Sequence, residues 1–118
     1  MKIYDCTTFY SEHMMMDIRF HVLNEFVHKF VVVESLFSHS GKKKKLNFDI
    51  NNYPKFKDKI IYLVIDREPE NIIKSNMELE QNEKRINSLK RIDLSYNCMS
   101  KGIKDAADED LIILSDND

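Results

Sequence analysis

The segment LIILSDND, residues 111–118, begins with four apolar residues and ends with two aspartates around one asparagine. A short apolar run between polar residues is typical of a strand that is buried on both faces of a parallel sheet. Open α/β sheets bind ligands at the carboxyl ends of their strands. The segment therefore predicts a buried strand over residues 111–114, with Asp116 and Asp118 at the end where a ligand would bind.

These two aspartates allow two interpretations. Their carboxylates are hard oxygen ligands that suit Mn²⁺ or Mg²⁺, and such a cation can neutralise a diphosphate. Aspartate and asparagine are also common turn residues after a strand. Because Asp-X-Asp is a short pattern, the tripeptide alone favours neither the metal site nor the turn.

Three other segments are strand candidates because they are rich in β-branched and aromatic residues. They are residues 2–5, 30–33 and 59–65. Strands that alternate with helical stretches define an α/β fold with a mostly parallel sheet. In a doubly wound sheet the first and fourth strands lie side by side. We therefore expect Cys6, Thr7 and Thr8 next to Asp116.

The stretches between these strands carry helix signals. Ser11 can cap a first helix that opens with Glu12. Its apolar residues recur with helical spacing and predict the buried face; they are Met15, Ile18, Val22 and Phe26. The cluster Met14-Met15-Met16 is interpreted as core filling.

A second helical stretch is expected within residues 70–102, which are long, charged and weakly periodic. Its apolar anchors are Ile86, Leu89, Ile92 and Leu94. Gly102 is placed to end the helix. Residues 38–48 form a loop with four consecutive lysines, and such a run is more typical of a solvated surface than of a phosphate site.

The composition argues against several classes of protein. Eighteen Lys and Arg against 20 Asp and Glu give a formal net charge of −2, which argues against nucleic acid as the main partner. Two cysteines, Cys6 and Cys98, are too few for a disulfide scaffold and fit a reducing compartment. No apolar run approaches the ~20 residues of a transmembrane helix. We expect one cytoplasmic domain, either free or peripheral to a membrane.

Several pieces of the chain, taken in order, match a family pattern. They are DIR at 17–19, Leu23, Val27, KFVVVES at 29–35, HSGK at 39–42, DKII at 58–61, Asn97, Gly102, Ala107 and DLIILSDND at 110–118. Together they resemble glycosyltransferase family 17, the family of β-1,4-mannosyl-glycoprotein 4-β-N-acetylglucosaminyltransferase. The family sequence continues Glu-Ile-Pro after this ending. We therefore expect residues 1–118 to be the N-terminal, nucleotide-sugar-binding part of one glycosyltransferase domain, inactive by itself.

This resemblance implies a GT-A-like, Rossmann-like fold and a metal-dependent glycosyltransferase. It implies a UDP-N-acetylglucosamine donor, a β-linked mannose of a glycan as acceptor, and Mn²⁺ or Mg²⁺ as cofactor. The implied metal ligands are Asp116 and Asp118. The implied nucleotide-sugar-binding residues are Cys6, Thr7, Thr8, Glu34, Ser35 and Asp116, with Arg19, His39 and Asn97 as further candidates. The family often has Gln-Arg where this chain has Ser95-Tyr96, and no residue is assigned as the catalytic base.

Individual side chains keep alternative interpretations. Glu34, at the end of the second strand, stands where an acid commonly hydrogen-bonds a ribose, or it is an acid that faces solvent. Arg19 forms either a salt bridge or a ligand contact. His39 is a loop histidine or a catalytic base, and Asp5 is a turn former or part of a nucleobase pocket. Cys98 is interpreted as a small buried hydrophobe.

Two rival functions remain beside the enzyme. One is a non-catalytic α/β module, truncated or decayed, that binds a nucleotide or only a partner protein. The other is a phosphohydrolase that uses Asp-X-Asp, which is weaker because its nucleophilic aspartate normally follows the first strand.

Overall fold

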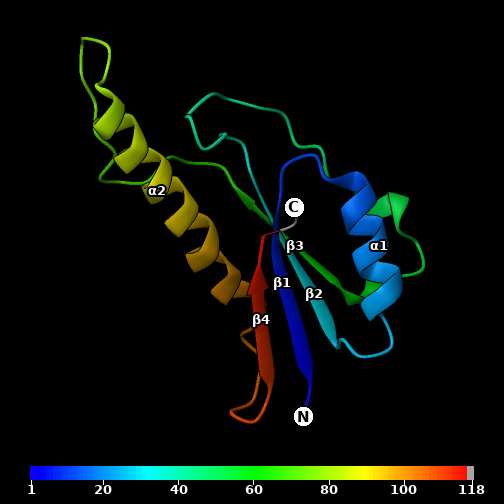
Figure 1. Cartoon of the computed structure of the whole chain (residues 1–118). Helices are drawn as coiled ribbons and strands as arrows, with labels where there is room; N and C mark the ends of the chain where they lie inside the picture. Colours follow the sequence, from blue (N-terminus) through cyan, green and yellow to red (C-terminus); the bar gives the residue numbers. More distant parts are fainter. Residues whose placement is uncertain (117–118) are drawn as a thin grey trace.

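Four parallel strands form one sheet in the computed structural model, which describes residues 1–116 (Figure 1). The strands are β1 (Ile3–Phe9), β2 (Lys29–Ser35), β3 (Ile60–Ile65) and β4 (Leu111–Ser115). The helices are α1 (His13–Leu23) and α2 (Gln81–Cys98), with short 3₁₀ turns at Ile50–Asn52, Lys57–Lys59 and Met99–Gly102. The predicted α/β class and parallel sheet are confirmed.

The strand order is β3-β2-β1-β4, the order of a doubly wound, Rossmann-like sheet. After β3 the chain crosses to the other side of β1, where β4 pairs with β1. Thr7 lies opposite Ser115 in this pair of strands. The prediction that Cys6, Thr7 and Thr8 lie beside the end of the fourth strand is therefore confirmed. Ligands bind at this switch point in folds of this kind.

Side chains alternate along the strands and divide the core into two layers on opposite faces of the sheet. The layer under α1 contains Phe9, Met16, Phe20, Val27, Phe30, Val32, Phe48, Tyr53, Phe56 and Ile60. The layer under α2 contains Tyr4, Cys6, Val31, Val33, Ile65, Cys98 and Met99. Figure 1 shows one helix on each side of the sheet.

The buried face of α1 differs from the predicted stripe. Met16 and Phe20 are the buried side chains of this helix. The predicted residues are exposed instead, at 42% for Met15, 47% for Ile18, 63% for Val22 and 66% for Phe26. Both sets have helical spacing, so periodicity could not choose between them; the ring cluster around Phe20 decides the orientation.

The start of α1 also differs from the prediction, because Ser11 provides no cap. Glu12 precedes the helix, and its Oε2 accepts hydrogen bonds from the backbone amides of Tyr10 and Ser11, at 2.7 and 2.8 Å. Only Met16 of the methionine cluster fills the core, since Met14 is 72% exposed.

The helical prediction for residues 70–102 holds only from Gln81 onward. A capping box between Glu80 and Glu83 starts α2 there. The side chain of Asn87 binds both the amide and the carbonyl of Ile73, at 2.8 and 3.0 Å, and so holds the preceding loop against the helix. Of the predicted anchors, Leu89 is 50% exposed.

Gly102 ends the helical run as predicted, for a packing reason. A Cβ at this position would lie 2.5 Å from Cγ1 of Val31, far inside van der Waals contact. Glycine therefore lets the turn after α2 lie directly on the central strand β2.

The last strand is not buried on both faces, which corrects the prediction. Leu111, Ile113 and Leu114 are 45%, 36% and 54% exposed, and Ile112 packs on the core. The reason is position: β4 is an edge strand of the sheet that residues 1–116 form, and it pairs with β1 on one side.

Candidate functional site

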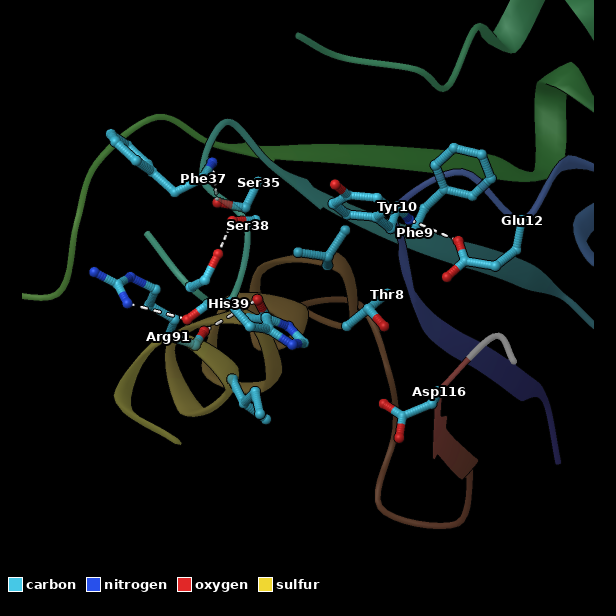
Figure 2. Close-up of a pocket in the computed structure, with 14 residues that line it drawn as sticks. Thr8, Phe9, Tyr10, Glu12, Ser35, Phe37, Ser38, His39, Arg91 and Asp116 are labelled. Atoms are coloured by element: carbon cyan, nitrogen blue, oxygen red, sulfur yellow. Dashed lines mark hydrogen bonds between the residues drawn. The ribbon is translucent and has the colours of Figure 1, made fainter. Parts of the chain in front are cut away.

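A pocket of about 600 Å³ opens at the carboxyl ends of the strands (Figure 2). Thr8 and Ser35 reach it from β1 and β2, and Asp116 follows β4 directly. His39 comes from the loop after β2, and Arg91 comes from the middle of α2. The pocket thus combines hydroxyls, an imidazole, a guanidinium and a carboxylate.

Four of the predicted site residues meet at this pocket: Thr8, Ser35, His39 and Asp116. Cys6, Thr7, Glu34 and Arg19 are not among its lining residues. Asn97 lines a separate shallow groove beside α2, and Asp118 lies outside the described residues.

Glu34 is fully buried, so the interpretation as an acid that faces solvent is wrong. Its carboxylate accepts hydrogen bonds from Lys44 Nζ at 2.8 Å, from the Asn47 and Phe48 amides at 2.7 and 3.0 Å, and from the Tyr62 hydroxyl at 2.6 Å. Burial by itself raises the pKa of Glu34, but these hydrogen bonds, led by Lys44, lower it overall.

These four bonds use the acceptor capacity of the Glu34 carboxylate. Three of them, from Lys44, Asn47 and Phe48, tie residues 36–48, the segment that we call the pocket loop, to the end of β2. The ribose contact of Glu34 stays a prediction, and the geometry gives this carboxylate an internal role instead.

Arg19 forms a salt bridge, which confirms that interpretation. Its Nε and Nη2 donate to the carboxylate of Asp5 at 2.5 and 2.6 Å, and Nη2 also donates to Ser115 Oγ. Asp5 is 1% exposed and lies inside β1, so the turn interpretation of Asp5 is wrong. The bridge joins α1, β1 and β4 just below the pocket end of the sheet.

Both cysteines are buried and free. Cys6 is completely buried, and burial raises the pKa of its thiol to about 11, with the charge of Asp5 adding to the rise and Arg19 opposing it. Cys98 is also buried, as predicted. Thr7 is buried next to Cys6 and donates its hydroxyl to the Thr8 carbonyl at 3.2 Å.

Asp116 is exposed in the pocket and has one described hydrogen-bond donor. The hydroxyl of Tyr96, on α2, donates to Asp116 Oδ1 at 2.5 Å. Within residues 1–116, no three His, Cys, Asp or Glu side chains are grouped to hold a metal ion. Because a hard cation takes about six oxygen ligands, Asp116 does not form a cation site on its own.

The pocket loop positions His39 from two sides. A bridge between Phe37 and Lys43 closes the loop, and Gly41 makes its turn with a φ of +90°. On the α2 side, Arg91 Nη1 and Ser88 Oγ donate to the His39 carbonyl at 3.0 and 2.9 Å. The lysine run is otherwise a solvated surface as expected, except that Lys44 turns inward to Glu34.

Tyr10 and Arg91 are among the pocket residues that sequence reasoning missed. Tyr10 could have been found from the rule of strand ends, had the first strand been extended to Phe9. Arg91 gives no local signal, because it is one of several basic residues on a charged helix. Only the packing of α2 against the pocket loop brings it to the site.

The fold and pocket define a Rossmann-like α/β protein with a polar site at the switch point of its sheet. The sequence model of Glycosyltransferase family 17 matches residues 1–118, and the chain belongs to this family. No curated protein and no solved structure matches the chain. Among the described residues, neither helix is long and apolar enough to cross a membrane.

Proposed function

We propose that this glycosyltransferase binds its nucleotide-sugar donor in the pocket at the ends of β1, β2 and β4. The observation that carries the proposal is the convergence of Thr8, Ser35, His39 and Asp116 at the switch point of the sheet. Membership of the family supplies the reaction class, the transfer of a sugar.

Different parts of the pocket suit different parts of such a donor. Tyr10 is 52% exposed, with Lys44 Nζ at 5.3 Å from its ring centroid, and offers an aromatic face to a nucleobase. The hydroxyls of Thr8 and Ser35 and the imidazole of His39 offer hydrogen bonds to ribose, diphosphate or sugar.

The particular donor that we propose is UDP-N-acetylglucosamine, and the proposed acceptor is a β-linked mannose of a glycan. The resemblance to the characterised enzymes of the family supports both. We also propose that Mn²⁺ or Mg²⁺ binds at Asp116 and Asp118 together with the donor diphosphate. Titration of Mn²⁺ by calorimetry, with and without UDP, tests this, because tight binding without nucleotide would contradict a shared site.

Calorimetric titration with UDP-N-acetylglucosamine tests the donor pocket. In the presence of Mn²⁺, Asp116→Asn should weaken binding by at least about tenfold, because it removes a charged ligand of the cation that the donor diphosphate shares, and an interaction with a charged group contributes about 1.5–3 kcal/mol. Asp108→Asn is the matched control, because this substitution removes the same charge at the opposite end of β4. Equal affinities of the wild-type and Asp116→Asn proteins would contradict the placement of the donor.

An assay of transfer tests the expectation that residues 1–118 are inactive by themselves. Labelled N-acetylglucosamine should not move from UDP to a glycan that carries a β-linked mannose. Metal-dependent transfer that is abolished by Asp116→Ala would show that the catalytic residues lie within this part of the chain.

A further inference from the structure

The ion pair between Glu68 and Arg91 stands beside the pocket and has no part in the donor site as proposed above. Arg91 Nε and Nη2 donate to Glu68 Oε1 and Oε2 at 2.9 and 2.7 Å. This parallel arrangement fixes the plane of the guanidinium as well as its position. Glu68 follows β3, so the pair joins that strand end to α2.

The remaining side of the guanidinium faces the pocket loop. Arg91 Nη1 donates to the carbonyl of His39, and Figure 2 shows this bond with the imidazole of His39 directed into the pocket. Gly41 lies against the same guanidinium, since a Cβ at Gly41 would collide with Arg91. The loop is therefore seated directly on the Arg91 side chain.

Ser88 adds a second donor to the same carbonyl, from one turn earlier on α2. Two donors on one carbonyl hold the backbone of His39, while its imidazole stays exposed in the pocket. The arrangement restricts the histidine without occupying its ring.

We propose that Glu68 and Arg91 form a positioning pair that orders His39 for the donor. This rests on the proposed function, because the ligand that His39 meets is the nucleotide-sugar. Arg91 acts through the backbone of His39, and Glu68 acts through Arg91. Ordering a residue before binding removes a cost of roughly 0.5–1.5 kcal/mol from association, which corresponds to about 2- to 13-fold in affinity.

The variant Glu68→Gln tests the pair, because Glu68 is not among the pocket-lining residues. With UDP as the probe, calorimetry should show a 2- to 13-fold weaker affinity for this variant. Glu78→Gln is the matched control, because it makes the same change in an exposed ion pair with Lys84, and neither of these two residues lines the pocket. The melting temperatures of both variants show whether either change acts through global stability.

A double-mutant cycle with His39→Ala separates positioning from direct contact. If the pair acts through His39, Glu68→Gln should cost no further affinity for UDP once the imidazole is absent. If the cost is unchanged in that background, Arg91 contacts the nucleotide itself and the proposal is overturned.

Nuclear magnetic resonance of the ligand-free protein tests whether the pair positions His39, without any need for donor binding. The imidazole and amide resonances of His39 should shift or broaden in Glu68→Gln and stay unchanged in Glu78→Gln. Unchanged His39 resonances in Glu68→Gln would overturn the positioning pair. Failure of the wild-type chain to bind UDP, with the resonances altered as expected, would count against the proposed donor and leave the pair supported.

Discussion

Glu34 and Lys44, ten residues apart in the chain, form a buried ion pair in which Nζ lies 2.8 Å from Oε2. The carboxylate is fully buried and the lysine side chain is 11% exposed. This pair anchors the pocket loop beneath the site, while Arg91 holds it from α2. The wall of the pocket therefore depends on a charge that lies outside the pocket.

The Glu34 contact predicts a dependence of stability on pH. Because the folded state lowers the pKa of Glu34 below its ordinary value of 4.5, the carboxylate stabilises the fold at any pH above that value. This contribution is lost as the pH falls through the folded pKa. Glu34→Gln should reduce the free energy of unfolding by roughly 3 kcal/mol at pH 7, and the difference from the wild type should shrink as the pH falls below 4.5. Urea titrations at the two pH values measure it.

Tyr62→Phe is the control for this experiment, since it removes one donor to Glu34 and leaves the pocket loop bonds in place. We expect a smaller loss, about 1.5 kcal/mol at pH 7. A loss for Glu34→Gln that is independent of pH would show that the ionised form is not what stabilises the loop.

The Asp5–Arg19 bridge predicts strong non-additivity. Asp5→Ala should lower the free energy of unfolding by about 3–5 kcal/mol, because it leaves the partly buried guanidinium of Arg19 without its carboxylate partner. The double variant Asp5→Leu with Arg19→Met should recover most of that loss, since apolar replacements of a buried pair are often neutral. Thermal unfolding of the wild type, Asp5→Leu, Arg19→Met and the double variant measures the coupling, and additive losses would argue against a direct pair.

The orientation of α1 predicts opposite outcomes for two neighbouring residues. Phe20→Ala should lower the free energy of unfolding by about 3–5 kcal/mol, because Phe20 is fully buried among aromatic rings. Val22→Ala should change it by no more than about 0.5 kcal/mol, because Val22 is 63% exposed. Chemical denaturation measures both losses. A larger loss of unfolding free energy for Val22→Ala than for Phe20→Ala would refute this orientation of α1.

Thiol labelling tests the burial of Cys6. A buried thiol whose pKa is raised to about 11 is almost entirely protonated at pH 8 and is a poor nucleophile. The native protein should therefore react slowly with a disulfide reagent, whereas the urea-unfolded chain should release signal from both cysteines at once. Rapid labelling of Cys6 in the native state, identified by mass spectrometry, would contradict the structure.

Local pattern was enough to predict the strands and the end of the sheet at which the site lies. Runs such as those around Val32 and Ile112 are strand-forming by composition, and parallel pairing places their carboxyl ends together. This is why Thr8 and Asp116 could be proposed from the strand pattern, whereas Ser35 was implied by the resemblance to the family. The first strand was predicted too short, because Cys6 and the threonines after it do not form an apolar run.

The sequence by itself determined the α/β class, the four parallel strands and the neighbourhood of Thr8 and Asp116, because these follow from residue types close together in the chain. Only the tertiary structure decided which face of α1 is buried, which groups the carboxylate of Glu34 binds and how Arg91 reaches His39. Those outcomes depend on contacts between residues 10 to 52 positions apart. Local periodicity does not predict such contacts, because they depend on how the helices, strands and loops pack against one another.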